Sequence, residues 1–186
     1  MMDVFTGKHV RLSAVDPEEM SKRLTHWSRD SEYMRLLNGE AFRMNSTVAN
    51  GKWLEKDLEN PSPDLYYFTV HTLADNELIG DIALEVSGWG ARNGFIGLGI
   101  GDPEARNKGY GTDLMNVILR FAFLEVNLRR VTLTVFEYNP RAIRVYEKAG
   151  FRHEGRFRSF MQREGRRWDM LFMGILHEEW MKLNNL

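Results

Sequence analysis

The sequence contains no cysteine, and this absence excludes disulfide bonds, thiolate nucleophiles and zinc sites with cysteine ligands. It also has no run of about 18 apolar residues, the length that a membrane-spanning helix requires. At the N-terminus no charged region precedes an apolar stretch, so the sequence predicts no signal peptide. We therefore expect a protein without membrane spans that works in the cytoplasm, where cysteine would stay reduced.

Neither sign of charge is in excess, because 25 Lys and Arg face 26 Asp and Glu and give a net charge of -1. Nucleic-acid-binding domains carry a strongly basic surface, so nucleic acid is not an expected partner. The five histidines are scattered without the spacing of a metal site, and we expect no metal. A basic run at 152–167 is either the solvated face of a hairpin or a rim that attracts an acidic or nucleic-acid-bound partner.

Alternating and periodic apolar residues predict one α/β domain with a mixed sheet. Strands are expected at 8–15, 65–72, 78–86, 95–100, 130–136, 151–163 and 166–176. Helices are expected at 16–28, 30–37, 46–59 and 140–149, and directly after Gly111. Asp16-Pro17 and Asn139-Pro140 mark two helix starts, because Asp and Asn are favoured caps and Pro is favoured at the first helical position.

A glycine-rich turn, Arg106-Asn107-Lys108-Gly109-Tyr110-Gly111, lies between a predicted strand and a predicted helix. Glycine lets the backbone approach a ligand closely, and free N–H groups at a helix start bind anions such as a pyrophosphate. Arg106 and Lys108 would add positive charge beside it. The turn is equally compatible with a plain strand-to-helix connection. It does not match the P-loop, and Gly97, Gly99 and Gly101 lie inside a strand, unlike the dinucleotide-binding fingerprint.

The spacing Arg106-x-x-Gly109-x-Gly111 resembles the acetyl-CoA motif of the GNAT superfamily, [R/Q]-x-x-G-x-[G/A]. The preceding segment 96–103 is similar to the strand that enters this motif in the family. Segment 135–151, which ends in Tyr-Glu-Lys-Ala-Gly-Phe, is similar to a second family signature. The resemblance covers most of residues 8–176 and extends to the branch that acetylates ribosomal proteins and polyamines.

This resemblance implies a single-domain GNAT fold over 1–186, with a mixed, mostly antiparallel central sheet of about seven strands flanked by helices. The sheet would be splayed between strands 95–100 and 130–136. The acceptor side would occupy about 1–92, the acetyl-CoA-binding half about 93–176 and a C-terminal tail 177–186. Dimers are common in the family, so a homodimer is possible, and Trp180 in the tail is a candidate contact.

The resemblance also implies an acetyl-CoA-dependent N-acetyltransferase that moves the acetyl group to a primary amine by direct attack in a ternary complex. The amine would belong to a protein N-terminus or to a small polyamine. The expected acetyl-CoA-binding residues are Leu98, Gly99, Ile100, Arg106, Asn107, Lys108, Gly109, Tyr110, Gly111, Thr112, Asn139 and Tyr146. Tyr146 would also be catalytic, as the acid that protonates the departing thiolate. Helix capping by Asn139 and core packing by Tyr146 are the simpler structural interpretations.

The acceptor side is less well defined by the sequence. Tyr33, Trp27 and Glu85 are candidate substrate-binding residues, although core packing or solvation also explains them. Phe95 occupies the position where many relatives carry a glutamate that accepts the amine proton, so Asp81, Glu85 and Glu137 are alternative bases.

That departure leaves open a non-catalytic acyl-CoA-binding or sensor domain on the same fold. A protein whose glycine turn binds a different phosphate, in a nucleotide or a nucleic acid, is a second alternative.

Overall fold

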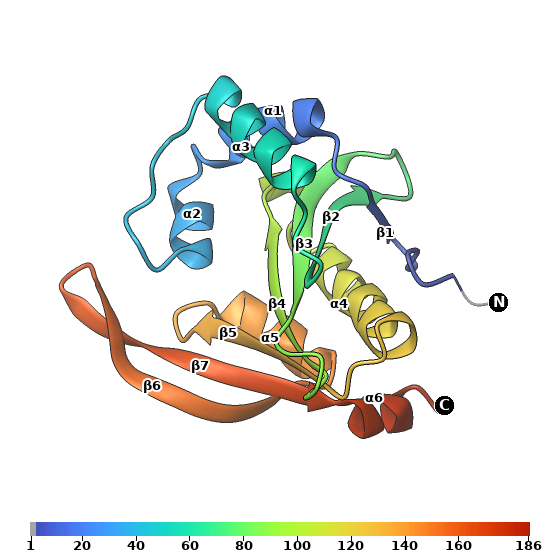
Figure 1. Ribbon diagram of the computed structural model, residues 1–186. Coiled ribbons are helices and arrows are strands. Elements are labelled where there is room, and N and C mark those ends of the chain that lie inside the picture. Colours follow the sequence, from blue (N-terminus) through green and yellow to red (C-terminus); the bar gives the residue numbers. More distant parts are fainter. Residues whose placement is uncertain (1–2) are drawn as a thin grey trace.

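The computed structural model describes residues 3–186, which form a seven-stranded sheet with helices on both faces (Figure 1). The strand order is β1-β2-β3-β4-β5-β7-β6, and every neighbouring pair is antiparallel except β4 and β5. The strands are β1 (Val10–Ser13), β2 (Leu65–Thr72), β3 (Leu78–Val86), β4 (Asn93–Ile100), β5 (Arg130–Phe136), β6 (Arg152–Arg163) and β7 (Arg166–Leu176). The predicted mixed, mostly antiparallel sheet is confirmed.

Six α-helices accompany the sheet, and five of them were predicted close to their observed ends. They are α1 (Pro17–Trp27), α2 (Ser31–Leu37), α3 (Thr47–Glu59), α4 (Tyr110–Arg120), α5 (Pro140–Lys148) and α6 (His177–Leu183). The Asp16 carboxylate accepts N–H groups at the start of α1, and the Asn139 amide oxygen accepts the Ala142 N–H at 3.1 Å. These two starts follow the capping rule that the sequence indicated.

The C-terminal tail was predicted without secondary structure, and there the prediction was wrong. Residues 177–183 form α6, and the Trp180 side chain is only 3% exposed. Its ring packs on Phe123 with 5.4 Å between ring centroids. Trp180 therefore fills the core of its own chain and is not available as a contact between two copies.

Two apolar clusters lie on opposite faces of the sheet. The larger one packs α4 and α5 against the sheet and includes Leu84, Ile96, Leu114 and Ile118. The smaller one joins α1, α2 and α3 and includes Met20, Trp27, Tyr33, Leu54 and Leu78. In Figure 1, α1 and α3 lie above the sheet, and α2 lies to the left of β4. This cap of helices comes entirely from the first third of the chain.

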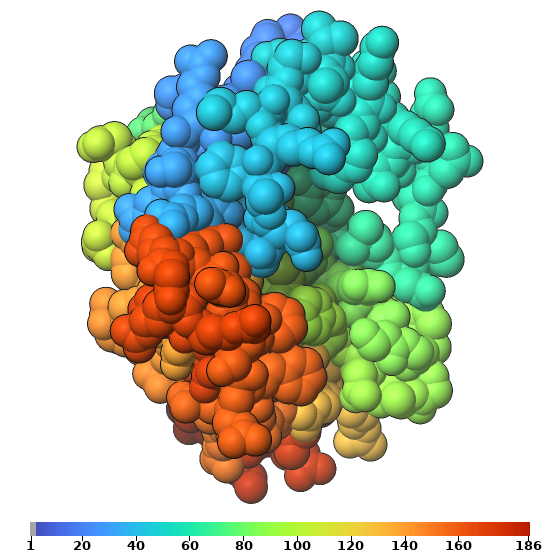
Figure 2. Space-filling view, turned by 90° about the vertical axis from the view of Figure 1, so that its left-hand side faces the viewer, coloured from blue at the N-terminus to red at the C-terminus, as the bar shows by residue number. Residues whose placement is uncertain are grey.

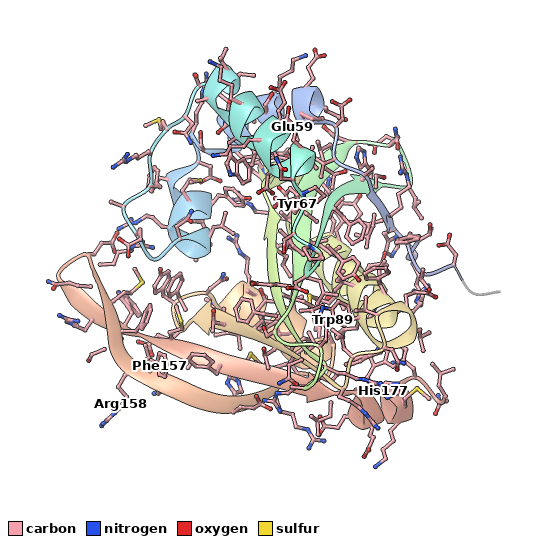
Figure 3. All side chains as sticks on the ribbon, viewed as in Figure 1. Glu59, Tyr67, Trp89, Phe157, Arg158 and His177 are labelled. Carbon is pink, nitrogen blue, oxygen red and sulfur yellow. The ribbon has the colours of Figure 1, made fainter. Side chains whose placement is uncertain are left out.

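The β6–β7 hairpin extends away from the sheet toward α2, as its orange-red ribbon shows in Figure 1. Most arginines of the basic run are engaged within the molecule. Arg156 pairs with Asp169, Arg152 pairs with Glu179, and the Arg166 guanidinium lies 4.0 Å from the Trp168 ring centroid. Arg158 points outward from this arm (Figure 3), whereas the Phe157 ring packs on Phe172 of β7 with 4.5 Å between ring centroids. These contacts favour the interpretation of the run as a hairpin face.

The sheet divides between β4 and β5, as predicted. These two strands pair only at three positions, from Asn93 with Arg130 to Phe95 with Thr132. Beyond Phe95 they separate, so the backbone edge of β4 from Ile96 to Ile100 has no strand partner on that side. Such an edge presents free N–H and C=O groups, which can pair with an extended ligand. Within residues 3–186, no helix has the length and apolar character to span a membrane.

Candidate active site

A cavity of about 560 Å³ fills the gap between β4 and β5. Its walls come from four elements that lie far apart in the sequence: β4, β5, α5 and α2, together with the turn before α4. Ten of the twelve predicted acetyl-CoA-binding residues line it, namely Leu98, Gly99, Ile100, Arg106, Asn107, Gly109, Gly111, Thr112, Asn139 and Tyr146. The splayed strands thus bring the two sequence motifs to one site.

The turn at one end of this cavity has the geometry of an anion site. Asn107 and Gly109 both adopt positive φ, 63° and 87°, and α4 begins at Tyr110 with no side chain capping its first turn. The first N–H groups of a helix have no partner within the helix, and the helix dipole adds positive potential there. Gly111 faces the cavity, where an added Cβ would lie 3.6 Å from the Val145 side chain. This end suits a pyrophosphate.

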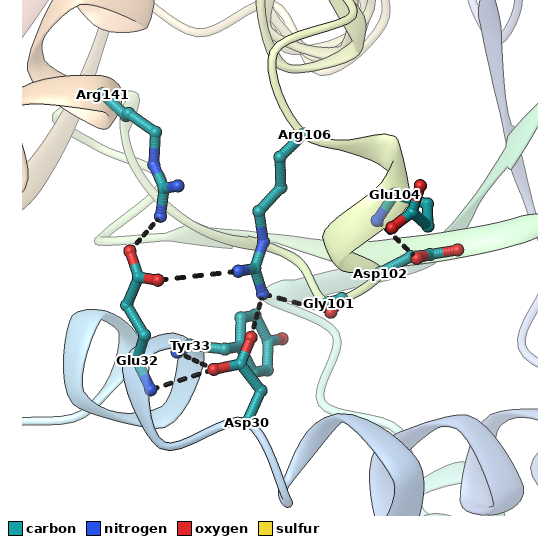
Figure 4. A network of polar contacts seen from close by, with 8 residues as sticks. All are labelled: Asp30, Glu32, Tyr33, Gly101, Asp102, Glu104, Arg106 and Arg141. Atoms are coloured by element: carbon teal, nitrogen blue, oxygen red, sulfur yellow. Dashed lines mark hydrogen bonds and ion pairs between the residues drawn. The ribbon is translucent and has the colours of Figure 1, made fainter.

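The Arg106 side chain lines the cavity and also forms contacts that the sequence did not indicate. Its guanidinium donates to Asp30 Oδ2 at 2.6 Å and to the Gly101 carbonyl at 3.4 Å (Figure 4). Burial raises the pKa of Asp30, but the hydrogen bonds from Arg106 and from two backbone N–H groups outweigh it and lower that pKa. The positive charge of Arg106 is therefore matched by Asp30, and this pair attaches α2 to the turn.

Two other predicted acetyl-CoA-binding residues do not line the cavity. Lys108 is exposed at the top of the turn. Tyr110 packs against the larger core, with its ring 6.4 Å from the His9 ring. The reason is geometric: in this turn, Asn107, Gly109 and Gly111 face the cavity, so their neighbours point elsewhere.

Tyr146 lies on the buried face of α5 and lines the cavity with 8% of its surface exposed. Its ring packs 6.1 Å from that of Phe151. Burial raises the pKa of the Tyr146 phenol to about 12, so the hydroxyl keeps its proton at neutral pH. A protonated hydroxyl at this place can donate a proton to a leaving group. The structural and catalytic interpretations of Tyr146 are thus compatible.

The predicted substrate-binding residues separate in the structure. Tyr33 lines the cavity, and its hydroxyl lies over Gly99, where an added Cβ would be only 2.5 Å away. Trp27 does not reach the cavity, because its ring is 1% exposed and lies against Gly101 beneath the helices. Glu85 is exposed on β3, beside Phe95, and also lies outside the cavity wall. For Trp27 the core-packing interpretation is correct.

Several lining residues were missed by the sequence analysis. Arg141, Arg144 and Lys148 supply positive charge from α5, and Leu36, Leu37 and Gly39 form the wall after α2. The three cations have three- and four-residue spacing on a predicted helix, so their common face was available as a signal. The α2 wall carried no such local pattern.

Long-range contacts fix the cavity wall that α2 and the residues after it form. Arg141 donates to Glu32 at 2.8 Å, and Arg163 on β6 donates to the carbonyls of Arg35 and Asn38. With the Arg106–Asp30 pair, α2 is therefore fixed from the turn, from α5 and from the hairpin. Within residues 3–186, no group of three or more His, Asp or Glu side chains lies close enough to hold a metal ion.

Comparison with known proteins agrees with this geometry. Residues 9–152 match the acetyltransferase (GNAT) domain family. This chain belongs to the GNAT family. It is 30% identical over 177 residues to the SPbeta prophage-derived uncharacterized N-acetyltransferase YokL of Bacillus subtilis, and the match covers 94% of each protein. The protein is therefore a GNAT enzyme, an acetyl-CoA-dependent N-acetyltransferase.

Other relatives include polyamine acetyltransferases. The spermidine N(1)-acetyltransferase of Vibrio cholerae is 34% identical over 79 residues, which is 42% of this GNAT chain and 46% of that protein. A crystal structure of spermidine N-acetyltransferase from Vibrio cholerae in complex with CoA and spermine superposes with a TM-score of 0.80. The sequence identity is 24%, over 92% of this chain and 98% of the other, so this likeness establishes the shared fold.

Proposed function

We propose that this enzyme transfers an acetyl group from acetyl-CoA to the primary amine of a small cationic molecule, by direct attack in a ternary complex. One observation carries the proposal: the unpaired edge of β4 and the protonated Tyr146 hydroxyl line the same cavity. Tyr33, Leu36 and Leu37 of α2 line the same cavity opposite the acetyl-CoA motif. Both reactants therefore have a place beside one proton donor.

The main chain would hold the donor substrate. The pantetheine arm would pair with backbone groups of Leu98, Gly99 and Ile100, as an added strand does. The pyrophosphate would bind at Asn107–Thr112, and the cationic face of α5 at Arg141, Arg144 and Lys148 would balance its charge. Bound acetyl-CoA supplies a thioester whose carbonyl carbon forms the new C–N bond while the C–S bond breaks.

Tyr146 would act on the sulfur side of this reaction. Its phenol donates a proton to the thiolate as the C–S bond breaks, and solvent later returns a proton to the tyrosinate. Backbone N–H groups of β4 would stabilise negative charge on the thioester oxygen. Most of the rate gain would come from holding two reactants in register, because orientation removes a large entropic barrier.

The charge of the acceptor side supports a cationic amine. Asp81 and Glu85 lie on the same face of β3, on either side of Ala83. Within residues 3–186 no Lys, Arg or His forms an ion pair with either carboxylate. The polyamine acetyltransferases among the relatives lend further support to a small amine of this class.

The test is a turnover assay with acetyl-CoA that measures free thiol. Its acceptors are spermidine, spermine, simple diamines, amino acids and peptides with free N-termini. We expect saturable turnover with the polyamines and little with the peptides. Turnover restricted to peptides would transfer the assignment to protein N-termini. Tight CoA binding without turnover on any amine would contradict the proposal and favour the sensor alternative.

A further inference from the structure

The acceptor face of the sheet has a floor of small residues beside the free edge of β4. Gly97 on β4 pairs with Ala83 on β3, which in turn pairs with Tyr67 on β2. A Cβ added at Gly97 would meet no atom within 4 Å, so the space above this row is open. Figure 2 shows a recess in this part of the molecule, with green sheet residues below the cyan residues that follow α2. An amine that reaches the thioester from this side passes over Gly97.

The next row of the sheet carries a carboxylate. Asp81 pairs with Gly99 on one side and with Thr69 on the other, and its side chain is on the same face as Gly97. The Tyr67 hydroxyl, below α3 in Figure 3, donates to Asp81 Oδ2 at 3.2 Å. Among residues 3–186, no cation pairs with this carboxylate, and its other oxygen accepts no hydrogen bond from the chain. Asp81 therefore has an acceptor position free.

A buried hydroxyl, that of Tyr33, lies over the strand neighbour of this carboxylate. Tyr33 is 7% exposed, and its hydroxyl is buried with no hydrogen-bond partner in the described chain. It lies directly over Gly99, the strand neighbour of Asp81. Buried polar groups without partners are rare because they lose the hydrogen bonds of water. An unpartnered hydroxyl at this place is suited to a proton path.

We infer that Asp81 is the proton acceptor for the attacking amine, with the Tyr33 hydroxyl or one water molecule as the link. This inference rests on the proposed function. The bound ammonium first gives one proton to the link, and the link gives a proton to the Asp81 carboxylate. The neutral nitrogen then attacks the acetyl carbon as the C–S bond breaks. The Tyr146 proton goes to sulfur on the other side. The bonded nitrogen then loses its second proton to solvent, which also reprotonates the tyrosinate and takes the proton from Asp81, so the net products are the amide, the free thiol and one proton.

The surroundings of Asp81 bring its pKa closer to neutral pH, which suits a proton acceptor. Burial raises its pKa to about 6, and the Tyr67 hydrogen bond opposes the shift only in part. The charged groups that act on its two neighbouring tyrosines are Asp30 at the cap of α2, Arg106 before α4 and Asp57 on α3. His71 on β2 contacts Thr69, which pairs with Asp81. Burial and the Asp81 charge raise the pKa of both tyrosines, which stay protonated.

The two other candidate bases are less suitable. Glu137 Oε1 accepts the backbone N–H of Asp169 at 3.0 Å and so serves the contact between β5 and β7. Glu85 is exposed to solvent beside Phe95 and has no hydroxyl relay toward the cavity. Asp81 also explains how Phe95 can occupy the position of the usual family glutamate, since the base lies one strand further into the sheet.

The experiment compares the pH dependence of kcat/KM for Asp81→Asn and for the wild-type enzyme, with an alkylamine acceptor of pKa near about 10. The wild-type rate is expected to fall below pH about 6, where Asp81 becomes protonated. At pH 7 the kcat/KM of the variant should be about 100-fold lower than that of the wild-type enzyme, because the variant accepts only amine that is already neutral. Its rate should rise tenfold per pH unit toward the amine pKa.

A weakly basic acceptor, such as an aromatic amine, separates proton removal from binding. This acceptor is neutral at every assay pH, so the deficit of Asp81→Asn should shrink to about tenfold or less. Asp57→Asn removes an exposed carboxylate from α3 near Tyr67 and should behave as wild type. CoA affinity, measured by calorimetry, should not change in either variant.

Three outcomes would overturn the inference. One is a wild-type pH profile in Asp81→Asn, and another is an equal deficit with both classes of amine. The third is a Tyr33→Phe enzyme and an Asp81→Asn enzyme that both keep wild-type rates. The absence of turnover in the wild-type enzyme would instead be a failure of the proposed function, so the two failures are distinguishable.

Discussion

The two sides of the cavity are built in different ways. On the acetyl-CoA side, the main chain dominates: the β4 edge, the positive-φ turn at 107–109 and the start of α4 all present backbone groups. On the acceptor side, side chains dominate: Tyr33 from α2 lines the cavity over Gly99, and Asp81 on β3, the strand neighbour of Gly99, accepts from Tyr67 on β2. A backbone site requires particular spacing and glycine, whereas a side-chain site requires only that distant segments meet. The first leaves a motif in the sequence and the second does not.

The Arg106–Asp30 pair joins the two sides. Arg106 belongs to the acetyl-CoA motif, yet its guanidinium holds the N-terminus of α2 on the acceptor side. Both side chains are largely buried, so separating them leaves a poorly solvated charge. This contact suggests that the motif arginine contributes to the acceptor wall as well as to the turn. Variants on either side, and at the junction, test how separate the two sides are.

The largest effect is expected at Tyr146, where the two sides meet. Tyr146→Phe should lower kcat by about 100-fold or more, since general acid catalysis typically contributes 10²–10⁴-fold. The KM values for acetyl-CoA and for the amine should change little, because the ring keeps its packing against Phe151. Steady-state kinetics provide the measurement. Tyr66→Phe, on β2 and packed against the larger core, is the matched control and should keep wild-type turnover.

The acetyl-CoA side alone should respond to Gly111→Val. The new side chain would occupy cavity space near Val145 and block the approach to the first N–H groups of α4. Loss of two charge-assisted hydrogen bonds corresponds to about 3 kcal/mol, so the Kd for CoA should rise about 100-fold. Calorimetry measures this change. Gly155→Val on the exposed strand β6 is the control, and an unchanged Kd at Gly111→Val would remove the turn from the binding site.

A change in the Arg106–Asp30 pair should affect the KM values of both substrates, but unequally. Asp30→Asn keeps a good helix cap for α2 but removes the charge that faces Arg106. We expect KM for the amine to rise about tenfold, with a smaller change for acetyl-CoA, because the freed α2 wall belongs to the acceptor side. Asp16→Asn, at the exposed cap of α1, provides the matched control. Equal changes in both KM values would show that the pair supports the two sites alike.

The smallest effect concerns stability. The pKa of Asp81 is raised in the folded protein, so the native state binds its proton more tightly than the unfolded chain. Stability is therefore lost as the pH rises from about 4 to about 6, which spans the unfolded and folded pKa values. Asp81→Asn avoids this loss, so its free energy of unfolding at pH 7.5 should be about 1–2 kcal/mol higher than that of the wild-type protein. Urea unfolding at pH 4 and pH 7.5 measures the difference, which should disappear at pH 4.

Much of the fold could be predicted from local patterns. The strands at 65–72, 78–86, 130–136 and 166–176 were predicted with their observed ends, because aromatic and β-branched residues gather there between polar turns. The turn at 106–111 was identified because positive φ and a free helix start demand glycine. Helix α6 was missed, since seven residues give little periodicity, and packing of Trp180 on Phe123, a long-range contact, helps to stabilise it.

The candidate residues that were misplaced show the limit of this method. Trp27 and Tyr33 lie in adjacent helices and have similar chemistry, yet one is covered by Gly101 and the other reaches the cavity over Gly99. Arg106 lines the cavity as expected, but its guanidinium also binds Asp30, 76 positions away in the chain. Contacts over such distances depend on how α2 docks, and no local pattern encodes docking.

The sequence by itself determined the strands, most helices, the glycine turn and the position of Tyr146, because backbone conformation and side-chain periodicity act over a few neighbouring residues. The tertiary structure decided which carboxylate has a free oxygen near the open floor at Gly97, and which tyrosine hydroxyl lies beside it. Desolvation and unsatisfied hydrogen bonds exist only once β2, β3, β4 and α2 have packed together. The acceptor chemistry of this enzyme therefore arises from packing.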